Sequence, residues 1–82
     1  MSALELYAKQ AQEKRGYEHM QAIKSLRSYI NLTSEEELIR YINMITDMDI
    51  LRTLTEAGMR GNTHKALISR MNLLIKEQTG GV

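Results

Sequence analysis

Apolar side chains recur every three or four residues along most of this chain, which is the spacing of amphipathic α-helices. No stretch alternates apolar and polar residues for long, and the strand formers Val, Phe and Trp are almost absent. Strong helix formers such as Leu, Met, Ala, Glu and Lys dominate instead. The pattern therefore predicts an all-α fold, a small bundle of four or five helices joined by short turns.

The first helical stripe follows a capping signal. Ser2 precedes Glu5 by three residues, which is the spacing of a capping box, so Ser2 is predicted to cap the first helix. Gly16 interrupts the pattern, because a glycine costs about 1 kcal/mol inside a helix. Residues 2–31 are therefore interpreted either as one long helix kinked at Gly16 or as two shorter helices broken there.

The middle of the chain carries further helix starts. Thr33 or Ser34 is predicted to cap a helix whose first turn holds three glutamates, which the helix dipole favours. The apolar face of this helix is predicted to consist of Leu38, Ile39, Ile42 and Ile45. Thr46 is predicted to cap the next helix, with Asp49 at the third position.

The last third of the chain is predicted to begin with a turn. Gly58 is expected to end the preceding helix in a left-handed conformation. Arg60 and Gly61 are predicted to form the turn, and Asn62 or Thr63 to cap the final helix. The inner face of that helix is predicted to consist of Ala66, Leu67, Met71, Leu74 and Ile75.

Length and composition limit the classes of function. The 82 residues suffice for one small domain, predicted over residues 1–78, with residues 79–82 as a flexible tail. A domain of this size buries only about 60% of its unfolded surface, so we expect a homo-oligomer or docking on a partner. The absence of Cys excludes disulfides and Cys-ligated zinc. No signal peptide or membrane-spanning run is apparent, so we expect a cytoplasmic chain without membrane insertion.

Charge is distributed unevenly along the sequence. Residues 1–32 carry a net charge of +2, residues 33–58 carry −4 and residues 59–82 carry +3, within a total of +1. An acidic middle between basic ends suits pairing with a charged partner or a second copy. Helix capping and a solvated surface explain the same pattern, because three of the acids fall in one first turn.

Residues 54–71 fit a second function. Ala57, Gly61 and Leu67 have the small–glycine–apolar spacing of a helix-turn-helix. The side chains suited to phosphates and base edges would be Asn62, Thr63, His64, Lys65, Ser69 and Arg70. DNA binding by residues 62–71 is therefore the alternative hypothesis. An ordinary helical hairpin is favoured over it, because the chain is not strongly basic.

No arrangement of residues indicates catalysis, a cofactor or a metal. His19 and His64 have no partner at the spacing of a helical metal pair. Asp47 and Asp49 lack the glycine and distal glutamate of a calcium loop. No nucleophile motif or glycine-rich phosphate loop is present. We therefore expect a protein that is not an enzyme.

Methionine favours a protein partner. Six Met accompany no Phe or Trp, and Met both fills cores and lines surfaces that bind several shapes. The favoured interpretation is a non-enzymatic regulatory protein that binds another protein, such as the cytoplasmic part of a membrane protein. The candidate partner-binding residues are Met44, Met48, Met59, Arg60, Lys65 and Arg70.

Two runs carry a resemblance to a known family. Together with the length and helical character, AIKSLR at residues 22–27 and INMITD at residues 42–47 resemble the cytoplasmic antiholins of T-even-type phages. The resemblance covers residues 1 to about 78 and transfers no functional residue. It implies a protein that binds the cytoplasmic segment of a holin and helps a periplasmic antiholin to delay host lysis.

Overall fold

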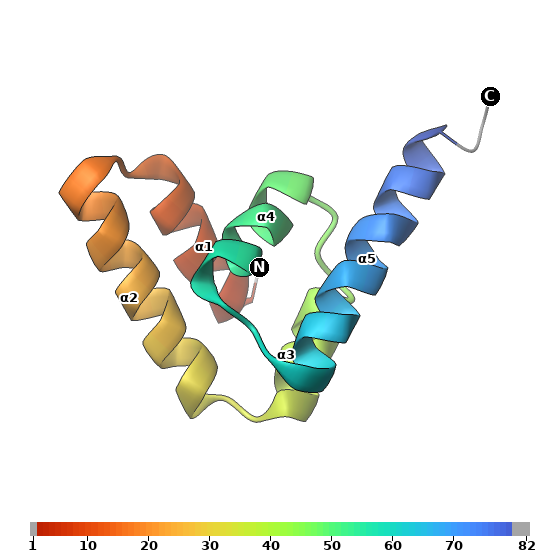
Figure 1. Cartoon of the computed structure of the whole chain (residues 1–82), viewed down its shortest axis with the longest axis horizontal. Helices are drawn as coiled ribbons and strands as arrows, with labels where there is room; N and C mark the ends of the chain where they lie inside the picture. The colour runs from red at the N-terminus through yellow and green to blue at the C-terminus, as the bar shows by residue number, and fades with distance from the viewer. Residues whose placement is uncertain (1, 80–82) are drawn as a thin grey trace.

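The computed structural model describes residues 2–79 and consists of α-helices without any strand in that range (Figure 1). The helices are α1 (Ala3–Glu13), α2 (Gly16–Leu32), α3 (Glu35–Ile42), α4 (Met48–Ala57) and α5 (Gly61–Thr79). The all-α prediction is confirmed. Thr79 still belongs to α5, and residues 80–82 of the predicted tail lie outside the described residues.

The helices form a bundle with α4 at its centre (Figure 1). The hairpin of α1 and α2 lies on one side of α4, and α5 lies on the other. α3 packs against α5, which runs beyond the other helices towards its C-terminal end. Three helices, α1, α2 and α5, therefore contact α4 from different directions.

Two glycines divide the chain where backbone geometry requires them. α1 ends at Glu13 and α2 begins at Gly16, whose φ of 59° lies in the left-handed region. Residues 2–31 thus contain two helices with a break rather than one kinked helix. Gly58 ends α4 with φ 84°, which confirms the prediction made for it.

The predicted helix starts are partly correct. The hydroxyl groups of Ser2 and Ser34 accept the N–H of Glu5 at 3.2 Å and of Glu37 at 3.3 Å. Ser34 therefore caps α3, and Thr33 does not.

Two other predicted caps are wrong. Asp47 rather than Thr46 caps α4, because its short carboxylate already reaches the N–H of Asp49 at 2.8 Å. α5 begins at Gly61, where the N–H of His64 bonds the Arg60 carbonyl at 3.3 Å. The final helix thus starts earlier than predicted, and neither Asn62 nor Thr63 is its cap.

An aliphatic core joins the helices. Its largest completely buried side chains are Leu4, Leu26, Ile42, Ile45, Leu51, Leu54 and Leu67. Ile45 reaches this core from beyond the end of α3, not from within the helix as predicted. Ile75 is 47% exposed, so its predicted place on the inner face of α5 is wrong, whereas Leu74 is buried.

Candidate functional site

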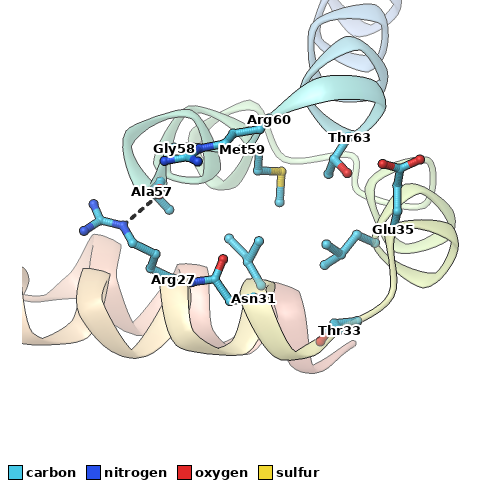
Figure 2. A pocket seen from close by; sticks show the side chains of 11 residues that line it. Arg27, Asn31, Thr33, Glu35, Ala57, Gly58, Met59, Arg60 and Thr63 are labelled. Carbon is cyan, nitrogen blue, oxygen red and sulfur yellow. Dashed lines mark hydrogen bonds between the residues drawn. The ribbon is translucent and has the colours of Figure 1, made fainter.

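A cleft of about 700 Å³ opens between the C-terminal part of α2, the start of α3, and the turn from α4 into α5 (Figure 2). Its lining consists of Arg27, Ile30, Asn31, Thr33, Glu35, Leu38, Ala57, Gly58, Met59, Arg60 and Thr63. Binding sites in proteins combine such a volume with an apolar lining and a few convergent polar groups. The cleft has this volume and several polar groups, and its exposed lining is more polar than apolar.

The floor of the cleft is apolar. Ile30 comes from α2, Leu38 from α3, and Met59 from the turn after α4. Leu38 and Met59 belong to the buried core, while Ile30 is half-buried. The sulfur of Met59 points into the open space (Figure 2). An apolar side chain from another molecule would find a flexible, polarisable contact surface here.

Arg27 forms one wall of the cleft and connects two helices. Its Nε donates to the carbonyl oxygen of Ala57, the last residue of α4, at 3.1 Å (Figure 2). The cation thereby satisfies a carbonyl group at the negative end of the α4 dipole. This hydrogen bond fixes the guanidinium group at the mouth of the cleft.

The opposite wall is made by the first turns of α3 and α5. The amide Nδ2 of Asn62 donates to Oε1 of Glu35 at 3.1 Å. Thr63 is only 5% exposed, and its hydroxyl has no hydrogen-bond partner among residues 2–79. Because Thr63 also lines the cleft, the hydroxyl can bond water or an occupant there.

A second polar cluster lies away from the cleft, around His19. The imidazole Nδ1 lies 2.6 Å from the carbonyl oxygen of Ala11, and Nε2 lies 2.9 Å from Oε1 of Glu56. The Glu56 side chain, and next the Ala11 carbonyl, raise the pKa of His19 above its ordinary value of 6.5. The cluster joins α1, α2 and α4, which indicates a structural role.

The structure separates the candidate partner-binding residues. Met59 and Arg60 both line the cleft, but Met59 is only 7% exposed and contributes to the floor. Met44 is 58% exposed, and Met48 packs partly against the core. Lys65 is exposed outside the cleft lining.

The last candidate, Arg70, holds a loop in place. Its Nε donates to the Ile45 carbonyl oxygen at 2.9 Å, and the side chain is half-buried. This contact fixes the segment between α3 and α4 against α5. Arg70 therefore has a structural partner already, like Arg27.

The residues of the DNA-binding alternative do not form one surface of accessible side chains. Thr63 is buried, Asn62 is bound to Glu35, and Arg70 is held by the Ile45 carbonyl. The remaining members, His64, Lys65 and Ser69, are exposed.

Several cleft residues were not predicted from the sequence. Arg27, Asn31 and Glu35 come from α2 and α3, whereas the candidate residues were sought between positions 44 and 70. The Arg27–Ala57 hydrogen bond joins residues 30 positions apart. No spacing rule connects such distant segments, so no signal in the sequence alone marks the cleft.

Comparison with known proteins adds nothing to these observations. No protein-family model, curated protein or solved structure matches this chain. Among the described helices, none combines the length and apolarity needed to cross a membrane. Within residues 2–79, no group of three or more His, Cys, Asp or Glu side chains could hold a metal ion.

Proposed function

We propose that this protein is a non-enzymatic regulator that binds another protein through the cleft between α2, α3 and the α4–α5 turn. The observation that carries the proposal is an open cleft in which Ile30 and Met59 lie beside two arginines, Arg27 and Arg60. Neither arginine forms an ion pair within residues 2–79. Apolar contact area supplies affinity at such a site, and the charges set encounter rate and register.

The particular class we propose is that of the cytoplasmic antiholins of T-even-type phages. The runs at residues 22–27 and 42–47 support this choice. Arg27 belongs to the first run and lines the cleft. The partner would be the cytoplasmic segment of a holin, and binding would delay host lysis. The protein would act in the host cytoplasm, as a homo-oligomer.

The DNA-binding alternative receives less support. Three of its six side chains, Asn62, Thr63 and Arg70, are buried or held by other parts of the fold. A phosphate backbone would also meet the Glu35 carboxylate beside the first turn of α5. Protein binding remains the better explanation of the cleft.

A blocking substitution tests the proposal. Asn31 is exposed at the edge of the cleft, so Asn31→Trp fills the opening without removing a core contact. Lys24→Trp places the same ring on an exposed position of α2 outside the cleft and serves as the control. Tagged variants are purified from the native host after nuclease treatment, with membranes solubilised, and bound proteins are quantified by mass spectrometry.

We expect a stoichiometric protein partner with the unsubstituted chain and with Lys24→Trp, and at least a tenfold loss, roughly 1.4 kcal/mol, with Asn31→Trp. A synthetic peptide of the holin's cytoplasmic segment should compete for the same site. Equal recovery with both variants would place the partner elsewhere. Recovery of DNA alone, lost on nuclease treatment, would favour the alternative.

A further inference from the structure

The charged side chains of the cleft are separated by sign. Arg27 and Arg60 lie towards the end formed by the α4–α5 turn, and Glu35 lies at the opposite end (Figure 2). Glu35 accepts one hydrogen bond, from the neutral amide of Asn62, and forms no ion pair within residues 2–79. The cleft therefore has a positive end, an apolar middle and a negative end.

The positive end is prepared for a carboxylate. The Nε of Arg27 is already used on the Ala57 carbonyl, which holds the guanidinium plane in one place. Its terminal nitrogens have no partner among residues 2–79. A fixed guanidinium group with unused donors binds a carboxylate through two parallel hydrogen bonds. Arg60 adds a second positive charge, and its guanidinium group has no hydrogen bond or ion pair in the described chain.

The middle of the cleft selects an apolar side chain that is accompanied by a polar group. The half-buried side chain of Ile30 and the Met59 side chain, which is directed into the cleft, offer the apolar contact (Figure 2). Thr63 beside them is only 5% exposed, and its hydroxyl lacks a partner within the part of the chain that the structure describes. A polypeptide satisfies both requirements, because its backbone carbonyl and N–H groups accompany every side chain.

We propose that the cleft receives a segment of a partner protein in which an apolar side chain lies between an acidic residue and a basic residue. The acidic group binds at Arg27 and Arg60, the apolar group contacts Met59, and the basic group faces Glu35. This inference rests on the proposed function and adds the chemistry of the partner segment. In one chain direction, reversing the two charges of the segment would place like charges together at both ends, which is unfavourable. The reversed order therefore fits only if the segment binds in the opposite chain direction.

An unbiased selection experiment identifies such a segment. The probe is a random library of twelve-residue peptides displayed on phage and panned against the full chain. We expect the selected peptides to share the order acidic, apolar, basic, or the same order read in the opposite chain direction. Affinities of synthetic copies are then measured for the unsubstituted protein and for two charge variants.

Arg60→Glu reverses one charge at the positive end without breaking a hydrogen bond, and Lys24→Glu makes the same change outside the cleft. We expect Arg60→Glu to weaken the selected peptides about tenfold and Lys24→Glu to leave them unchanged. Replacing the acidic residue of the peptide by Lys should restore part of the binding to Arg60→Glu, because the Lys then faces the new carboxylate, although Arg27 still repels it. Such rescue by a second charge reversal is not expected if Arg60 acts only on folding.

Three results would overturn the inference: selected peptides without an apolar residue between opposite charges, equal binding by both variants, or no rescue. A host partner that binds normally to Arg60→Glu but not to Asn31→Trp would overturn only the charge assignment. The proposed function would then stand. Peptides that bind the cleft while a second copy of the chain displaces them would identify that copy as the occupant and overturn the assignment to another protein.

Discussion

The first turns of α2 and α5 share a sequence pattern and a backbone conformation, yet their surroundings differ. Both helices begin with Arg-Gly followed by His three residues after the glycine, and both glycines have φ 59°. At the start of α2, the space beside the first turn is filled, because His19 contacts Ala11 of α1 and Glu56 of α4. At α5, His64 is exposed and the first turn borders the cleft instead.

The difference shows that the role of a helix start depends on the elements that pack against it. Ala8 and Ala11 are completely buried on α1, and their small side chains let neighbouring helices approach. In the C-terminal part of α2, the longer side chains of Arg27 and Ile30 line the cleft instead. The space between them and the first turn of α5 stays open, and it becomes the candidate binding site.

The largest effect on stability is expected from a comparison of two apolar residues on α2. One lies in the packed core and the other borders the cleft. Leu26 is completely buried, so Leu26→Ala should lower the free energy of unfolding by about 2–5 kcal/mol. Ile30 borders the cleft and is half-buried, so Ile30→Ala should cost less than about 1.5 kcal/mol. Urea denaturation measures both values. Equal losses would mean that the cleft is packed as tightly as the core.

The next effect concerns the hydrogen bond from Arg27 to the Ala57 carbonyl. Arg27→Gln should lower the free energy of unfolding by about 1 kcal/mol, because the carbonyl of buried Ala57 loses its donor and regains water only in part. Lys24→Gln is the matched control, since it removes a positive charge from the same helix at an exposed position. Chemical denaturation of both variants checks the prediction. Identical stabilities would show that the Arg27 hydrogen bond does not stabilise the packing of α2 against α4.

The cluster at α2 should also make stability depend on pH. The pKa of His19 is raised in the folded state, so the charged imidazole stabilises the fold fully below the ordinary value of 6.5. This contribution should be lost as the pH rises through the raised pKa. Thermal unfolding followed from about pH 5 to about pH 9 should show the loss. His19→Gln should remove this dependence and His64→Gln should keep it. A flat profile for the unsubstituted protein would contradict the contact with Glu56.

The smallest expected effect on folding lies at the open helix start. Arg60→Glu should change the free energy of unfolding by less than about 0.5 kcal/mol, because the Arg60 side chain is exposed and has no partner in the described chain. Thermal unfolding measures it. A larger loss would show that Arg60 stabilises the α4–α5 turn. The rescue experiment would then be needed to separate the effect of Arg60→Glu on peptide binding from its effect on folding.

Local signals in the sequence predicted much of the fold. The caps at Ser2 and Ser34 and the glycine at the end of α4 involve residues within a few positions of each other. Their outcome depends on short-range geometry, which the sequence displays directly. The errors in the predicted helix starts arise where neighbouring residues compete for the same role. Asp47, for example, caps α4 in place of Thr46.

The candidate site was much harder to predict because it depends on contacts between distant segments. Arg60 was selected from its neighbourhood in the sequence, but Arg27 and Glu35 gain significance only when α2 and α3 meet the α4–α5 turn. Thr63 illustrates the opposite case. Its residue type suits a surface contact with DNA, yet the fold buries it in the first turn of α5.

Site-specific photocrosslinking in the native host tests the central claim, that the cleft binds a protein, most directly. A benzophenone amino acid is placed at Asn31 in the cleft, and at exposed Gln21 of the same helix, outside it, as the control. We predict one discrete protein adduct from position 31 upon irradiation, and none from position 21. The same adduct from both positions, or none from position 31 while a partner is still recovered by affinity purification, would contradict the claim.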